Sequence, residues 1–397
     1  MLNDNEYFAY VGNWRTGSAS WGQPPLSGYG FGIFRFEAQS GELTNPLSAF
    51  DDISVGAMAI DATRRILYCT NETMTPPGKV AGGGGQVCAF SIDPMSGSLT
   101  ELCRVPSYGS LPSYLTLDSS GRYLLVTNHT GRWPVTKIRS SGSGDFHIDV
   151  QYDDATTILF PIAPDGSIGK PCDVHVHDGT AGPLAKQTHS QPHSVVRAPN
   201  DDLFVVCDKG CDEIRMLRLD CEARKLELCG GRGMPLSPGS SPRYSVFHPT
   251  LRYFYVNHET APMISVLSYD VSGSARLVGT VDLLSPGYDN EASASASDLV
   301  LHPSGKYLYC LIRGIDAISA FDVNQSDGSL RPIQTLTLDA SGPRGCTFTP
   351  DGRFLLIAAL KSNEVAIWSV EADGTLAPTG KRVGQAFPGN VALMPIG

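Results

Sequence analysis

Short apolar runs alternate with polar turns along the whole chain, and two patterns of such runs recur. The first pattern is an apolar strand, a turn that carries Asp, Ser or Gly, and a second short strand. Its seven copies are FRFEAQSGELT, FSIDPMSGSLT, LFPIAPDGSIG, LRLDCEARKLE, SYDVSGSARL, FDVNQSDGSLR and WSVEADGTLAP. Strand-turn-strand units that return about every 50 residues are typical of a β-propeller, so seven copies predict seven blades.

The second pattern is a pair of apolar strands joined by a tight turn. Its six copies are MAIDATRRILYCTN, LTLDSSGRYLLVTN, VVRAPNDDLFVVCD, SVFHPTLRYFYVNH, LVLHPSGKYLYCLI and CTFTPDGRFLLIAA. A seventh copy is split, with VALMPIG at the C-terminus and EYFAYVGN at the N-terminus. Pairing these two segments would close the ring and remove its exposed edges. We therefore expect an all-β, seven-bladed β-propeller over residues 1–397, a single domain closed by its N- and C-terminal strands.

Composition and charge narrow the class of protein. The 42 glycines and 28 prolines suit many short strands with tight turns. No apolar run is about 20 residues long, which predicts no transmembrane helix. The start MLNDNEYFAY lacks the basic and apolar parts of a secretory signal, so we expect a cytoplasmic protein. A net charge of −10 disfavours nucleic acid or an anionic membrane as a partner.

The ten cysteines predict neither disulfides nor a metal site. Most of them lie inside predicted strands, and no CxxC pair or Cys/His zinc pattern is present. We expect them to be small, buried, reduced thiols.

Aligning the repeats on one another predicts which residues share one mouth of the channel. In a propeller blade the first strand lines the channel and the second strand runs back beside it. The start of the first strand and the end of the second strand therefore lie at the same mouth. The starts of the first strands carry Gly56, Ser113, His193, Arg243, Ser297, Arg344 and Gly389. The ends of the second strands carry Asn13, Trp14, Asn71, Glu72, Asn128, His129, Asp208, Lys209, His258, Glu259, Arg313 and Leu360.

The composition of this mouth suggests chemistry. Arg243, Arg313 and Arg344 converge there in a chain that is acidic overall, and buried like charges are costly unless they meet an anion. Arginine recognises a carboxylate or a phosphate through paired hydrogen bonds. His193 and Glu259 could then exchange protons with a substrate. The alternative is a solvated channel wall, because any propeller channel holds some polar residues.

Other features have structural explanations. Arg122, Arg252, Lys306 and Arg353 recur as hairpin-turn cations at the opposite mouth, where His248 and His302 stand in His-Pro turns. The glycine run 82–85 is followed by no Gly-Lys-Ser/Thr, so it is not expected to be a phosphate-binding loop. No G-x-S-x-G motif is present, which disfavours a hydrolase with a serine nucleophile. The Ser/Gly-rich stretch GRWPVTKIRSSGSGDF, from Gly131, is expected to be a long loop between strands.

Several stretches give the chain a family resemblance that covers nearly its whole length. They are QPHSVV, SPRYSVFHP, YVNHE, LHPSGKYLYCLIRG and SGPRGCTFTPDGRFLL. The chain resembles the seven-bladed propeller lactonases, which include bacterial 6-phosphogluconolactonases and fungal carboxymuconate-cyclising enzymes. The resemblance implies a site built from His193, Arg243, Glu259 and Arg313, with no metal and no organic cofactor.

The chain also departs from this family. Gln191 and Tyr244 stand where the family often has histidines, Leu360 stands where a Gln is common, and Ile312 replaces an Asn. Three insertions, at 15–29, 131–188 and 283–297, are expected to crowd the same mouth. These departures predict the pocket of the family with a substrate other than the sugar-phosphate lactone.

Together these observations favour a lactonase-like hydrolase that needs no cofactor and acts on a small anionic lactone or its hydroxy-carboxylate. Catalysis is assigned to His193, Glu259, Arg243 and Arg313. Residues expected to bind the substrate are Arg344, Tyr244, Gln191, His129, Glu72, Asn71, Trp14 and His258. Two alternatives remain: a cyclase, isomerase or lyase acting on an unsaturated carboxylic acid, and a non-enzymatic propeller that binds a small molecule or a protein. The sequence leaves monomer or homo-oligomer open.

Overall fold

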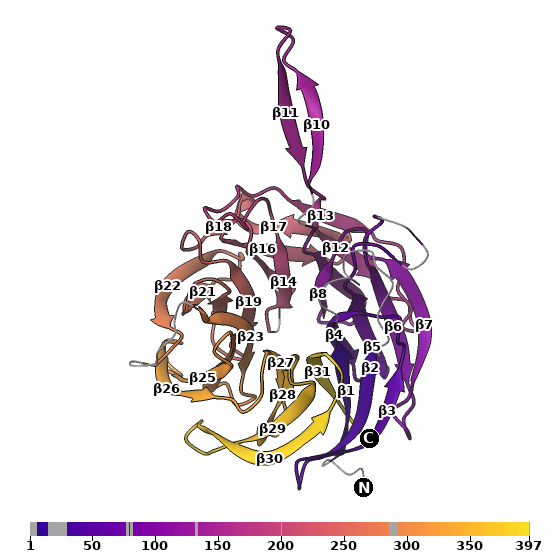
Figure 1. Ribbon diagram of the computed structural model, residues 1–397, viewed down its shortest axis with the longest axis vertical. Helices are drawn as coiled ribbons and strands as arrows, with labels where there is room; N and C mark the ends of the chain where they lie inside the picture. Colours follow the sequence, from indigo (N-terminus) through magenta and orange to yellow (C-terminus); the bar gives the residue numbers. More distant parts are fainter. Residues whose placement is uncertain are drawn as a thin grey trace.

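Seven antiparallel sheets stand in a ring around a central channel (Figure 1). The computed structural model describes residues 6–14, 30–76, 79, 82–131, 134–199, 201–285 and 293–396. Within these ranges the chain consists of strands, turns and one short 3₁₀ helix, η1 (Cys229–Gly231). None of the described segments is a helix long and apolar enough to cross a membrane. The expected all-β propeller is confirmed.

Each blade contains four strands, counted outward from the channel. The first strands are β4 (Val55–Asp61), β8 (Pro112–Leu117), β14 (Pro192–Arg197), β19 (Pro242–Phe247), β23 (Ser295–Leu301), β27 (Pro343–Phe348) and β31 (Pro388–Pro395). The second strands are β5 (Ile66–Asn71), β9 (Tyr123–Asn128), β15 (Leu203–Asp208), β20 (Tyr253–His258), β24 (Tyr307–Arg313), β28 (Phe354–Ala359) and β1 (Glu6–Asn13).

The outer half of each blade carries the remaining strands. The third strands are β6 (Gln86–Ile92), β12 (Ala155–Pro161), β16 (Glu213–Asp220), β21 (Met263–Tyr269), β25 (Ala317–Val323), β29 (Glu364–Val370) and β2 (Phe31–Glu37). The fourth strands are β7 (Leu99–Pro106), β13 (Asp173–His177), β17 (Lys225–Leu228), β22 (Ala275–Asp282), β26 (Leu330–Thr337), β30 (Leu376–Gly384) and β3 (Glu42–Ala49).

The two ends of the chain close the ring. β31 pairs antiparallel with β1, so one blade has the order β3-β2-β1-β31. Each first strand also contacts the first strand of the next blade, all the way round from β4 to β31 and back to β4. Closure by the terminal strands is thus confirmed.

The two sequence patterns meet at the contacts between blades. A tyrosine on the second strand of one blade donates its hydroxyl to the glycine carbonyl in the outer turn of the next blade. Examples are Tyr68 to Gly166 at 2.9 Å and Tyr309 to Gly374 at 2.7 Å. Gly374 has φ of +83°, and a Cβ there would lie 2.4 Å from the ring of Tyr307, so glycine is required.

The apolar cores lie between neighbouring blades. In one of them Tyr255 and Ile264 of one blade pack against Leu308, Phe321 and Ile312 of the next, and all five are buried. Each such side chain contributes roughly 1.5–3 kcal/mol when it leaves water. The ring is therefore held by packing that repeats from blade to blade.

Two elements are additional to the repeat. The short strand β18 (Met234–Pro235) pairs with β16, so that blade has five strands. Strands β10 (Val135–Ser140) and β11 (Phe146–Gln151) form a separate two-stranded sheet. The expectation of a long loop there was wrong, because both flanks of the Ser/Gly turn alternate apolar and polar residues, as a strand does.

The three expected insertions differ in outcome. Residues 15–29 lie outside the described residues, as do 286–292 within the third insertion. The range 131–188 is not one insertion, because it contains the regular blade strands β12 and β13. Only the β10–β11 hairpin and the segment after β13 are extra.

Candidate active site

Seven β-bulges mark one mouth of the channel. In every blade the pairing between the first and second strands shifts register at the beginning of the first strand. A bulge leaves a residue unpaired and turns its side chain in a new direction. The residues at these shifts include all seven that the alignment of the repeats grouped together: Gly56, Ser113, His193, Arg243, Ser297, Arg344 and Gly389.

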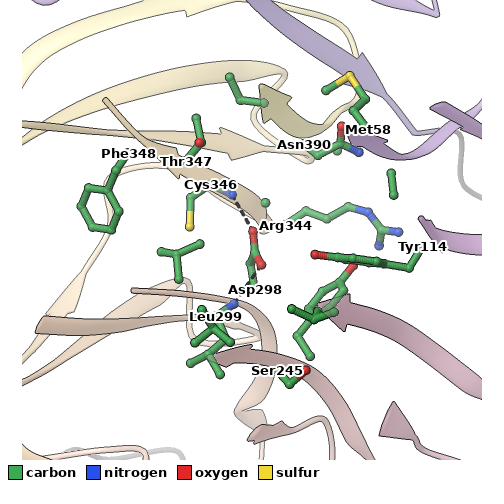
Figure 2. Close-up of a pocket in the computed structure, with 18 of the residues that line it drawn as sticks. Met58, Tyr114, Ser245, Asp298, Leu299, Arg344, Cys346, Thr347, Phe348 and Asn390 are labelled. Carbon is green, nitrogen blue, oxygen red and sulfur yellow. Dashed lines mark hydrogen bonds between the residues drawn. The ribbon is translucent and has the colours of Figure 1, made fainter. Parts of the chain in front are cut away.

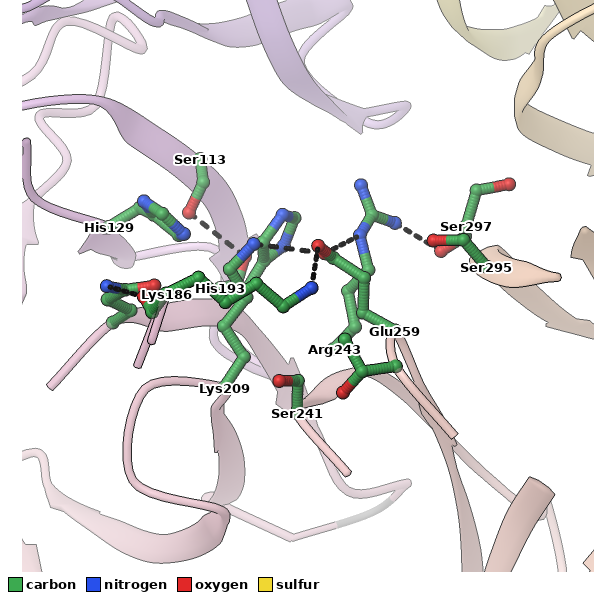
Figure 3. A network of polar contacts seen from close by, with 12 residues as sticks. Ser113, His129, Lys186, His193, Lys209, Ser241, Arg243, Glu259, Ser295 and Ser297 are labelled. Atoms are coloured by element: carbon green, nitrogen blue, oxygen red, sulfur yellow. Dashed lines mark hydrogen bonds and ion pairs between the residues drawn. The ribbon is translucent and has the colours of Figure 1, made fainter. Parts of the chain in front are cut away.

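Glu259 stands at this mouth among four cations, three of which Figure 3 labels. Its Oε2 lies 3.0 Å from Lys209 Nζ, 3.2 Å from Arg243 Nε and 3.8 Å from Arg313 Nη2. Its Oε1 lies 3.7 Å from Lys186 Nζ. The arginines come from β19 and β24, Lys209 follows β15, and Lys186 comes from the segment between β13 and β14. We call Glu259 and these four residues the Glu259 cluster.

The charges of the Glu259 cluster do not balance. Four cations face one carboxylate, which leaves three positive charges in excess. Burial alone would raise the pKa of Glu259, but Lys209, Arg243 and Arg313 together hold it well below its usual range. Burial, together with Arg243, lowers the pKa of Arg313 to about 10. Glu259 is therefore ionised at neutral pH, and the cluster keeps the capacity to attract an anion.

Arg243 is the most constrained of these cations. It is only 1% exposed, and its Nη1 donates to the carbonyl oxygen of Ser297. Its Cζ lies 4.4 Å from the centre of the Tyr244 ring. A guanidinium carries five N–H donors, so donors remain for a ligand after these contacts.

His193 lies beside the cluster as a buried imidazole. Its ring meets the rings of Tyr244 and His129 edge to face, with centroids 5.1 Å and 5.3 Å apart. Burial, and then Arg243 and Lys209, lowers its pKa well below the ordinary value, so the ring is neutral. Its Nδ1 has no hydrogen-bond partner among the described residues. A neutral imidazole with an unoccupied ring nitrogen can exchange a proton with a ligand or a water.

Glu72 occupies a different part of the same mouth. Its Oε2 accepts a hydrogen bond from Trp14 Nε1 at 2.6 Å and lies 4.0 Å from Arg344 Nη2. The Arg344 guanidinium stacks on the Trp14 ring, with Cζ 3.5 Å from its centre. Burial raises the pKa of Glu72, and Arg344 only partly offsets this. We call Glu72, Trp14 and Arg344 the Glu72 cluster.

Small residues in the ring make room for the Glu72 cluster. A Cβ at Gly56 would lie 2.7 Å from Glu72 Oε2, and a Cβ at Gly389 would lie 2.7 Å from Trp14 Cβ. Both glycines are thus needed where they stand.

A cavity of about 390 Å³ extends into the channel from these residues (Figure 2). All seven first strands contribute to its wall, which includes Tyr114, Tyr244 and Arg344. Asp298 also faces it, and its carboxylate accepts hydrogen bonds from the backbone N–H groups of Cys346 at 2.8 Å and Leu299 at 2.9 Å. Burial raises the pKa of Asp298. Polar groups inside a concave site of this size are typical of small-ligand pockets.

Other residues assigned to substrate binding belong to the wall. His258 is fully buried with Nε2 2.8 Å from Ser265 Oγ, and burial lowers its pKa to about 4. Asn71 is fully buried and accepts the backbone N–H of Ser54. Gln191 donates to the carbonyl of Lys186 at 3.2 Å, which ties down the segment that carries this lysine. These three residues support the site from behind.

Lys186 and Asp298 were missing from the predicted site, and Lys209 was placed at the mouth without a role. Lys209 could have been recognised from the sequence, because it occupies the same register position as Glu72 and Glu259. Asp298 follows the ring residue Ser297 within a wide bulge, which a repeat alignment does not reveal. Lys186 lies outside both repeated patterns.

The cysteines form no disulfides with one another, and within the described residues they do not gather into a metal site. All ten cysteines are free thiols, and five of them are buried. In the part of the chain that the structure describes, no three His, Cys, Asp or Glu side chains gather as metal ligands would.

Comparison with known sequences identifies relatives over nearly the whole chain. A family profile described as "Lactonase, 7-bladed beta-propeller" matches residues 25–393. A 6-phosphogluconolactonase of Bacillus subtilis is 24% identical over 387 residues, which cover 96% of this chain and 97% of that protein. A 6-phosphogluconolactonase of Sodalis glossinidius is 30% identical over 303 residues, which cover 75% and 79%.

Solved structures show the same fold. A periplasmic gluconolactonase of Pseudomonas aeruginosa superimposes with a TM-score of 0.82 at 24% identity, covering 99% of this chain and 100% of that chain. A putative 6-phosphogluconolactonase of Bacteroides fragilis gives a TM-score of 0.80 at 24% identity, covering 99% of both chains.

Proposed function

The chain belongs to the lactonase family of seven-bladed β-propellers, and from this premise we propose that it hydrolyses an anionic lactone at the Glu259 cluster. The observation that carries this proposal is the charge imbalance, with four cations around one carboxylate beside the neutral imidazole of His193. The channel cavity, whose wall includes Tyr244 directly beside Arg243, is large enough for a small ring compound.

The excess charge would hold the anionic group of the substrate. Arg313 is partly accessible, with 29% of its side chain exposed, and Ser295 Oγ accepts one of its N–H groups at 3.0 Å. Lys186 is 38% exposed and lies at the same carboxylate. Charge-assisted hydrogen bonds from such groups to a carboxylate or phosphate are roughly twice as strong as neutral ones. These two residues are the ones a ligand would reach first.

Hydrolysis then needs a proton to move. A water oxygen attacks the lactone carbonyl carbon while the imidazole of His193 accepts a proton from that water. The bond between the carbonyl carbon and the ring oxygen breaks, and the imidazolium returns the proton to the leaving alkoxide. The product is the open hydroxy acid, and one water is consumed. Buried cations such as Arg243 would stabilise the oxyanion that forms in between.

Glu259 would serve this reaction without accepting a proton. A carboxylate whose pKa lies well below the usual range is a poor base at neutral pH. Its role would be to hold Lys209, Arg243 and Arg313 in place, since their mutual repulsion would otherwise drive them apart. We therefore assign the proton transfer to His193 and the positioning of cations to Glu259.

The experiment is a panel of lactones, with proton release followed at constant pH above the spontaneous rate. The panel contains 6-phosphogluconolactone, neutral gluconolactone and an unsaturated lactone that carries a carboxylate. We expect at least one anionic lactone to be hydrolysed with a kcat/KM more than about tenfold above that of the neutral compound. Binding of the anionic compounds without turnover of any lactone would contradict the proposal and favour a ligand-binding propeller.

A further inference from the structure

The β10–β11 hairpin is a ribbon that stands clear of the propeller (Figure 1). Its two strands pair only with each other, in the register Thr136↔Val150, Ile138↔Ile148 and Ser140↔Phe146. The ribbon lies in the connection between β9 and β12, two strands of the same blade. It points away from the ring along the longest axis of the molecule.

The ribbon has one apolar face and one polar face, because side chains alternate along a strand and directly paired residues share a face. The apolar face carries Ile138, Phe146 and Ile148, which are 76%, 75% and 70% exposed. Val150 extends this face toward the base and is also exposed. The opposite face carries Lys137 and the ion pair between Arg139 and Asp149, at 3.0 Å. We call the first of these the apolar face of the ribbon.

An exposed apolar face of this kind is stabilised when another protein surface packs on it. An isolated two-stranded hairpin is at best marginally stable in water, and large exposed apolar side chains that adjoin one another mark interaction sites. Within the described residues the ribbon lies against no other strand of its own chain that could provide the cover. The described part of the chain therefore leaves this face open to a partner.

The distribution of charge favours a second copy as the cover. The chain carries a net charge of −10, so two copies repel each other over most of their surface. The ribbon is neutral, because Lys137 and Arg139 balance Asp145 and Asp149. It is thus a place where two copies can approach without that repulsion.

The same blade offers a further apolar surface to a second copy. β13 is the edge strand of the blade from which the ribbon projects, and its Val174 and Val176 are about half exposed. Its last residue, His177, pairs with Ala155, only four residues after the end of β11. In a two-fold dimer the same surface of each copy faces the other copy, so the ribbon and β13 of this one blade can together form the interface.

We propose that the ribbon is a dimerisation arm whose apolar face packs on the ribbon of a second copy of this chain. Packed face to face, the two ribbons form a small sandwich with the apolar side chains inside and the Arg139–Asp149 pairs in water. This inference is independent of the lactonase activity, because none of the residues of the arm belongs to the Glu259 cluster.

The test is the mass of the purified protein in solution, measured by light scattering and sedimentation from low to high micromolar concentration. We expect a dimer for the natural chain. Ile138→Asp combined with Ile148→Asp places two charges at one point of the apolar face and should weaken the dimer by about a hundredfold or more. The control Val135→Asp alters an equally aliphatic, 58% exposed residue on the polar face and should leave the dimer intact.

Thermal unfolding of the double variant checks that the propeller is unchanged, as expected for residues that pack on no other strand. Replacement of residues 135–151 by a short Gly/Ser linker provides a second route to a monomer. A natural chain that stays monomeric throughout, or a dimer that survives both changes, would overturn the proposal. If the natural chain is monomeric, the apolar face would instead be a binding surface for a different protein.

Discussion

Glu259 and Glu72 occupy the same position in two different blades. Each directly follows a second strand, β20 for Glu259 and β5 for Glu72. Each donates its backbone N–H over 2.8 Å to a serine carbonyl just before the bulge, Ser241 for Glu259 and Ser54 for Glu72. The backbone therefore places the two carboxyl groups in the same way.

Their neighbours make them different groups. Among the described residues Glu259 meets four cations and its pKa is held well below the usual range, whereas Glu72 meets one cation and burial raises its pKa. The repeat fixes where a side chain lies, whereas the residues around it, from its own blade, from other blades and from connecting segments, determine its charge. The chemistry of this propeller thus depends on residues that differ from one blade to the next.

The largest expected effect is on the proton transfer beside Glu259. His193→Ala should lower kcat by about 10²- to 10⁴-fold, the usual contribution of a general acid or base, while substrate binding changes little. Steady-state kinetics with an anionic lactone measure both. His302→Ala changes a histidine in an opposite-mouth turn and should leave kcat unchanged. An unchanged kcat in the His193 variant would remove the imidazole from the mechanism.

The next effect separates the two carboxylates through stability. Glu259→Gln should cost about 3–5 kcal/mol of unfolding free energy near neutral pH, because it leaves buried cations without their partner. The folded pKa of Glu259 is lowered, so its stabilisation is present above the unfolded pKa, near 4.5, and is lost as the pH falls through the folded pKa. Denaturant unfolding across pH measures this loss, which should shrink only in acid.

Glu72→Gln should act in the opposite direction and more weakly. The folded pKa of Glu72 is raised, so the ionised group destabilises the fold at neutral pH and this cost disappears as the pH falls toward the unfolded value. We expect a gain of at most about 1 kcal/mol near neutral pH, which vanishes in acid. The same unfolding series serves both variants. Losses of similar size in both would show that the two carboxyl groups are not in different environments.

The smallest effect is expected at the opposite mouth. Arg353 pairs with Asp351 at 2.6 Å and donates to the carbonyl of Ala38, so it is occupied in a turn. Arg353→Ala should keep kcat/KM within about twofold of the natural chain, as is usual for surface changes away from a site. A large loss of activity in this variant would mean that the two mouths have been assigned the wrong way round.

The fold could be predicted from the sequence because its blades repeat. The two patterns locate the first two strands and the outer turn of each blade, and the split copy explains the pairing of β31 with β1. The ribbon was wrongly predicted to be a loop, because its Ser/Gly turn is typical of loops. The alternation in VTKI and FHIDV on either side is the pattern that indicates strands. Local composition was a weaker guide there than periodicity.

The candidate site was predictable only as far as the repeat reaches. His193, Arg243 and Glu259 could be placed together by register alone, without knowledge of their contacts. Lys186 could not, because the segment between β13 and β14 has no counterpart in other blades. Nor could the pairing of Glu72 with Trp14, which follows from the packing around Gly56 and Gly389.

The most direct test of anion recognition at the Glu259 cluster is the selectivity of Arg243→Ala between an anionic and a neutral lactone. We predict that kcat/KM for the anionic lactone falls by about one to two decades, since a hydrogen bond to a charged group contributes roughly 1.5–3 kcal/mol. For the neutral lactone the loss should be clearly smaller, so the ratio of the two kcat/KM values should collapse. Equal losses for both lactones, or an unchanged ratio, would contradict the claim that this cluster reads the charge of the substrate.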